Sequence, residues 1–203
     1  MKKLFIIGLL SLFLLTGCGN DMSPTGAVEK FLSKYQKMDS EVLAQLDKVV
    51  SEDSDMSDEQ KKEYKTLMER QYQNMNYKIV NEEIDEDRAT VEVEIEVFDY
   101  ASSIRKSEEY YNENRDMFEQ ASHEENVDRE DGDIIEVSSK YIDYKIQQMK
   151  NVSDKIKYTL TFELEKKDKE WKVLEISDID RKKLHGLFEE YTIVSIFYFG
   201  FII

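Results

Sequence analysis

Several residue types that often carry structure or chemistry are scarce in this sequence. Its 203 residues include one cysteine, one proline and two histidines. A lone cysteine cannot form an internal disulfide bond, and His123 and His185 lie far apart with no cysteine to join them in a zinc site. We therefore expect a fold stabilised by its apolar core alone, and we predict no metal site and no cofactor.

The motifs of common catalytic sites are also missing. The chain has no Gly-x-Ser-x-Gly elbow and no glycine-rich phosphate loop. The acidic loop around Gly132 does not fit an EF-hand, because placing this glycine sixth puts Val127 first and Arg129 third, where oxygen ligands are needed. We assign no catalytic residue. A carboxylate paired with a tyrosine stays open, since 44 acidic residues and 12 tyrosines allow many such pairs.

Negative charge, by contrast, is abundant. The chain has 44 acidic and 28 basic residues, which gives a net charge of −16. Such a surface repels nucleic acids and anionic lipid headgroups. We therefore expect no nucleic-acid partner.

The N-terminus has the layout of a signal peptide. Lys2 and Lys3 precede an apolar run from Leu4 to Leu15, and small residues follow. As a helix, this twelve-residue run would rise only about 18 Å, against roughly 30 Å for the hydrocarbon core of a bilayer. Residues 1–17 are therefore predicted to be removed rather than to span the membrane.

The end of this segment, Leu15-Thr16-Gly17-Cys18, resembles the lipobox of bacterial lipoproteins. The resemblance implies cleavage before Cys18 and attachment of diacylglycerol to its sulfur, which would anchor the chain at the extracellular face of the cell membrane. The composition is similar to that of Gram-positive bacteria with AT-rich genomes. The alternative is a chance cysteine after an ordinary signal peptide. Without residues 1–17 the chain keeps 26 basic and 44 acidic residues, a net charge of −18.

Hydrophobic periodicity predicts three helices after a tether at 18–22. The first starts at Ser23-Pro24, the second near Asp39, and the third at Ser57, where the sequence SDEQ is a capping box that ends in Gln60. Each carries apolar residues at helical spacing on one face. Helices therefore precede the first strand.

Alternating apolar residues predict two hairpins, over 77–98 and 156–176. The roughly fifty residues between them are predicted to form two helices, and a last helix is predicted over 180–190. The expected fold is a single α+β domain over 23–190. In it, N-terminal helices pack on a curved antiparallel sheet of about four strands, with a helical insertion between the hairpins.

This pattern resembles uncharacterised Gram-positive lipoproteins with a nuclear-transport-factor-like, or cystatin-like, cone. The resemblance is carried by TGAVEKFLSKYQKMD, YKIVNEEIDEDRATVEVEIEVFD and YTLTFELEKKDKEWKVLEI. It implies a cone whose interior binds a ligand, performs acid–base chemistry or is filled by side chains. Fold alone does not choose among these.

Aromatic residues give the candidates for a pocket. Tyr158, Phe162 and Trp171 lie on the second predicted hairpin and would line a pocket or, as aromatics on a sheet more often do, form core. A second group would form a partner-binding face or, as apolar stripes more often do, core packed against the sheet. Its members are Tyr110, Tyr111, Met117 and Phe118.

The C-terminal segment 191–203, YTIVSIFYFGFII, is uncharged and rich in β-forming residues. It is too short for a helix to span a membrane. Three interpretations stay open: a terminal strand that completes the sheet, an apolar tail that touches a membrane or partner, and an altered gene end.

The expected function is that of a membrane-anchored extracellular lipoprotein that binds a protein, a cell-envelope component or a small ligand, and is not an enzyme. One alternative is an enzyme of isomerase or dehydratase type, with its site in the cone. Another is the substrate-binding component of a transporter, although the chain is short for the two lobes of such receptors.

Overall fold

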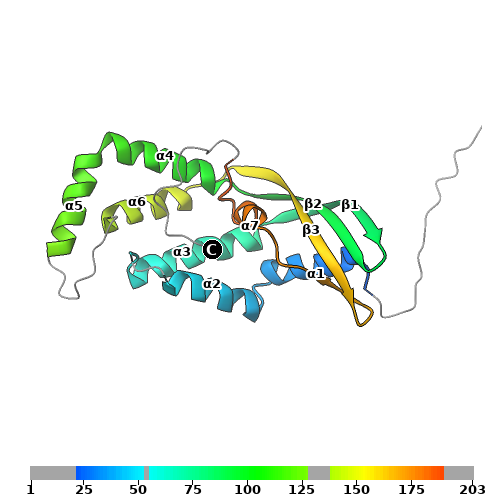
Figure 1. The fold of residues 1–203 in the computed structure, drawn as a ribbon. Helices are drawn as coiled ribbons and strands as arrows, with labels where there is room; N and C mark the ends of the chain where they lie inside the picture. Colours follow the sequence, from blue (N-terminus) through cyan, green and yellow to red (C-terminus); the bar gives the residue numbers. More distant parts are fainter. Residues whose placement is uncertain (1–21, 53–54, 128–137, 190–203) are drawn as a thin grey trace, which may run out of the picture.

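The computed structural model describes residues 22–52, 55–127 and 138–189. They form an α+β domain in which three N-terminal helices, a hairpin, a helical insertion and a second hairpin follow one another (Figure 1). The predicted signal peptide, Cys18 and the segment 191–203 lie outside the described residues. No helix in the described ranges is long and apolar enough to cross a membrane.

The three N-terminal helices begin where the sequence predicts. The Ser23 side chain caps α1 by accepting a hydrogen bond from the Gly26 amide at 3.1 Å. Ser57 and Gln60 form the predicted capping box at the start of α3, so each satisfies a backbone amide that the helix itself leaves free. The bounds are α1 Pro24–Gln36, α2 Ser40–Glu52 and α3 Asp58–Gln73.

Four antiparallel strands form one sheet in the order β1-β2-β3-β4. Its inner face is filled, because the inward side chains of β2 and those of Leu160, Phe162 and Leu164 in β3 are almost fully buried, and α1 lies across the sheet. Leu32 of α1 is fully buried in the same cluster. The strands are β1 Asn76–Asp85, β2 Arg88–Phe98, β3 Lys155–Lys167 and β4 Glu170–Val173.

The insertion contains three helices rather than the predicted two: α4 Tyr100–Glu113, α5 Arg115–Val127 and α6 Ser139–Lys150. Asn114 ends α4, since its amide donates to the carbonyls of Tyr110 and Tyr111, and α5 begins at the next residue. No glycine or proline marks this break in the sequence, which is why the periodicity of apolar residues did not locate it.

The aromatic residues of the insertion pack against α6, not against the sheet as expected. Phe118 is 2% exposed, and its ring centroid lies 5.2 Å from that of Tyr141. Tyr110 stacks on Tyr144 with ring centroids 4.5 Å apart. The prediction of a core against the sheet was wrong because the insertion projects beyond the sheet and builds an aromatic cluster of its own (Figure 1).

The last helix, α7 Asp178–Leu184, is shorter than predicted. Gly186 follows it with φ +71°, and a Cβ at this position would lie 2.1 Å from the carbonyl oxygen of Phe98. The Ala101 amide donates to the Gly186 carbonyl at 2.8 Å. A helix running on to residue 190 is therefore excluded by the close contact with the end of β2.

Candidate functional site: a groove between the N-terminal helices and the β4–α7 segment

A groove lies between α1, α2 and α3 on one side and β4 with the chain leading to α7 on the other. It consists of two adjoining parts of about 380 and 570 Å³. We call it the β4 groove. Both parts are lined by Phe31, Tyr35, Val42, Gln45 and Val173.

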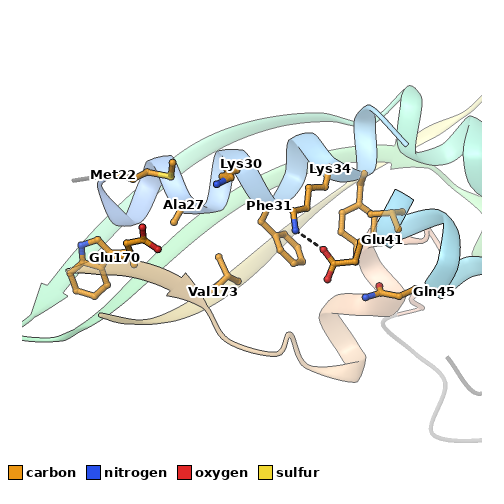
Figure 2. A pocket seen from close by; sticks show the side chains of 12 residues that line it. Met22, Ala27, Lys30, Phe31, Lys34, Glu41, Gln45, Glu170 and Val173 are labelled. Atoms are coloured by element: carbon orange, nitrogen blue, oxygen red, sulfur yellow. Dashed lines mark hydrogen bonds and ion pairs between the residues drawn. The ribbon is translucent and has the colours of Figure 1, made fainter. Parts of the chain in front are cut away.

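The first part of the β4 groove lies between α1 and β4 (Figure 2). Met22 and Glu170 stand at its outer end, and Phe31 points into it from α1. Trp171, the residue after Glu170, also lines this part. At the other end Lys34 and Glu41 form an ion pair at 2.6 Å that joins α1 to α2. Apolar and charged side chains therefore both line this part.

The second part ends at three aromatic rings, of which those of Tyr72 and His185 are buried and that of Tyr35 is half-buried. Tyr35 and Tyr72 meet edge to face with ring centroids 5.1 Å apart. The Tyr72 hydroxyl and His185 Nε2 share a hydrogen bond of 3.0 Å, although 113 residues separate them. His185 is 6% exposed, and its Nδ1 has no hydrogen-bond partner in the described part of the chain.

Burial sets the protonation of this pair. It lowers the pKa of His185 to about 4, with a smaller contribution from Arg181, and it raises the pKa of the Tyr72 hydroxyl well above its usual value. Both groups are therefore neutral near pH 7. Because the free nitrogen of His185 is itself buried, the pair joins α3 to α7 rather than exchanging protons with a substrate.

Among the described residues β4 is an edge strand of the sheet, and this edge adjoins the groove. The Leu174 amide donates to the Glu163 carbonyl at 2.9 Å. This hydrogen bond determines which backbone groups of β4 point toward β3 and which point away from it. In an antiparallel ladder, the N–H and C=O groups of Trp171 and Val173 must then point away from β3. These groups lie on the open edge of the sheet, beside the apolar side chains of the groove.

The structure separates the three residues predicted to form a pocket. Phe162 is 1% exposed and lies beneath the groove, with its ring centroid 5.6 Å from that of Phe31. Trp171 is half-buried at the outer end of the groove. Tyr158 faces a different hollow, of about 690 Å³, and its hydroxyl donates to the Phe188 carbonyl at 2.7 Å.

The sequence did not reveal Tyr35, Tyr72 and His185 as neighbours. The two tyrosines fit the apolar stripes of their helices, which indicates burial but not a partner. His185 follows the short helix α7 without any pattern of its own. Only the tertiary fold brings the three side chains together.

The described residues hold no group of three His, Cys, Asp or Glu side chains that could bind a metal ion. Comparison of the chain with protein-family models, with curated proteins and with solved structures finds no match. The site is therefore interpreted from its own geometry.

Proposed function

We propose that this protein is a lipid-anchored protein of the cell envelope whose domain binds an extended, apolar segment of a protein partner in the β4 groove. The anchor is inferred from the resemblance of Leu15-Thr16-Gly17-Cys18 to a lipobox. Two acyl chains on Cys18 would hold the chain stably at the membrane.

The observation that carries the binding role is the edge of β4, to which no strand of the described residues is paired, beside the apolar side chains of the groove. An extended segment can pair with the outward backbone groups of Trp171 and Val173 and place alternate side chains against Phe31 and Val42. The charged residues at the rim, which include the Lys34–Glu41 ion pair, would confine such an apolar segment to the groove.

An enzyme of isomerase or dehydratase type is supported less well. Such a site needs a carboxylate with a raised pKa in a pocket. Burial, and next the charge of Glu189, raises the pKa of Glu108, but this residue lies on α4 near Lys145 of α6, away from the β4 groove. The Tyr72–His185 pair lies in the groove, but both side chains are neutral, buried and hydrogen-bonded to each other.

The experiment is site-specific photo-crosslinking in cells that produce the full-length protein. Gln45 lines the groove and is exposed, so a photo-reactive side chain there would point at a bound segment without disturbing the core. Thr161 is exposed on the opposite face of the sheet and serves as the matched control. We expect a discrete crosslinked protein from position 45 and none from position 161.

A second substitution tests the apolar contact. Val49 is half-buried, lines the second part of the groove and follows Gln45 by one helical turn. Val49→Asp places a charge in the groove, and we expect the crosslink from position 45 to disappear while the protein stays in the membrane fraction. Leu43→Asp, on the same helix but outside the groove lining, should leave it unchanged. Equal crosslinking from positions 45 and 161, or an unchanged crosslink in the Val49 variant, would contradict this function.

A further inference from the structure

The tips of both hairpins and the start of α1 lie together at one end of the molecule (Figure 1). The amide and the hydroxyl of Thr25 donate to the Glu82 carboxylate at 2.8 and 2.7 Å, which ties the first turn of α1 to β1. The Lys166 amide donates to the Asp87 carbonyl at 2.7 Å and joins the two hairpins. We call residues 84–88 and 166–171, with Met22, the hairpin end.

The hairpin end exposes side chains that suit a lipid headgroup layer. Ile84 is 56% exposed and Met22 is 42% exposed. Trp171 is half-buried, and the Lys166 ammonium lies 5.6 Å from its ring centroid. Tryptophan is enriched at membrane–water interfaces, and lysine can extend its charge to the headgroups while its stem covers apolar surface.

Residues 84–88 and 166–171 contain five acidic and four basic side chains, so the hairpin end is almost neutral. A negatively charged bilayer would therefore repel these residues only weakly. Helices α4 and α5 lie at the end of the molecule opposite the hairpin tips (Figure 1).

The short tether sets the distance to the membrane. Met22, the first described residue, follows Cys18 by four positions, and four residues span at most about 14 Å when fully extended. A lipid on Cys18 would therefore hold the start of α1, and with it the hairpin end, close to the bilayer surface.

We propose that the hairpin end lies against the lipid headgroups and that helices α4, α5 and α6 project away from the membrane. This orientation rests on the proposed lipid anchor at Cys18. It places the Trp171 end of the β4 groove beside the bilayer.

The native fluorescence of the protein allows a direct test, because Trp171 is the only tryptophan. The lipidated protein is purified in detergent and reconstituted into vesicles of phosphatidylcholine and phosphatidylglycerol, with and without a nitroxide on the lipid headgroup. We expect the nitroxide to reduce Trp171 emission. A fluorophore on Glu119→Cys in α5 should keep its emission, and it can be attached uniquely because the lipid blocks the sulfur of Cys18.

Two variants separate the hairpin end from general apolar exposure. Ile84→Ser should weaken the quenching of Trp171, whereas Ile179→Ser, which removes an equally exposed side chain from α7, should not; their exposures are 56% and 55%. Flotation of the protein with the vesicles is measured in parallel.

The outcomes distinguish the orientation from the anchor. Protein that floats with the vesicles but shows no quenching of Trp171, or equal quenching at position 119, overturns the orientation and leaves the anchor intact. Protein that does not float overturns both. Quenching of Trp171 in the unlipidated Cys18→Ala chain would support the hairpin end as a lipid-binding surface independently of the anchor.

Discussion

The buried His185 should make the stability of this domain depend on pH in a way that a single substitution removes. Its pKa in the folded state is lowered to about 4 from an ordinary value of 6.5, because burial disfavours the charged ring. Between these two values the unfolded chain binds more protons than the folded one. The contribution of His185 to stability is therefore complete above pH 6.5 and is lost as the pH falls toward 4.

The size of the effect follows from the two pKa values. The linkage relation gives a loss of about 2 kcal/mol between pH 7 and pH 5, and about 3 kcal/mol by pH 4. Many carboxylates titrate in the same range, so the absolute profile does not isolate His185. The variant His185→Gln does, because glutamine keeps a polar partner for the Tyr72 hydroxyl but does not titrate.

The assay is urea unfolding of the mature chain carrying Cys18→Ala, followed by Trp171 fluorescence and by circular dichroism at several pH values. The unfolding free energy of the parent should fall by about 2 kcal/mol more than that of His185→Gln between pH 7 and pH 5. Parallel profiles for the two proteins would refute the reasoning and would place His185 in contact with water or with a stabilising anion.

Four further substitutions have direct expectations. Cys18→Ala should move the full-length protein out of the membrane fraction, and retention there would contradict the lipid anchor. Phe162→Ala should destabilise the domain by about 3–5 kcal/mol, because this side chain is buried. Trp171→Ala should destabilise it by only about 1–2 kcal/mol, because this side chain is half-buried. Equal losses of unfolding free energy in urea would contradict this difference. Gly186→Ala should cost more than about 3 kcal/mol or prevent folding, since its Cβ would meet the Phe98 carbonyl at 2.1 Å, and a stable variant with unchanged circular dichroism would show that this contact can relax.

Local signals in the sequence were sufficient to predict most of the fold. The capping box of Ser57 and Gln60 depends on residues three positions apart, and the inward side chains of β2 follow the simple alternation from Val91 to Val97. Interactions of this range leave a pattern that can be recognised without the tertiary structure. The fold class and the order of hairpins and insertion followed from them.

The groove could not be predicted in this way, because it depends on contacts between distant segments. Gln71 shows this well: it is fully buried, it accepts from the Phe98 amide at 2.9 Å and it donates to the Phe98 carbonyl at 3.1 Å. A glutamine in a helix gives no sign of such a role. This bridge and the Tyr72–His185 hydrogen bond hold α3 against the end of β2 and against α7. The second part of the β4 groove has its shape because of them.

The position of the groove relative to the membrane leads to a last prediction. Trp171 belongs both to the hairpin end and to the β4 groove, so a partner that enters there should present a segment close to the bilayer. Ten glycine and serine residues inserted between Asn20 and Asp21 would let the domain move away by roughly 17 Å.

We expect this insertion to reduce the crosslink from Gln45 in cells. The groove would then lie farther from the bilayer than the segment that it binds. The protein should stay in the membrane fraction and keep its unfolding free energy, since the inserted residues precede the first described residue, Met22. An insertion of ten residues after Gly132, between α5 and α6, is the control, because it adds the same length without changing the tether, the hairpin end or the β4 groove. If the longer tether leaves the crosslink unchanged, the partner reaches the groove from the aqueous side, and the hairpin end orients the domain without selecting what it binds.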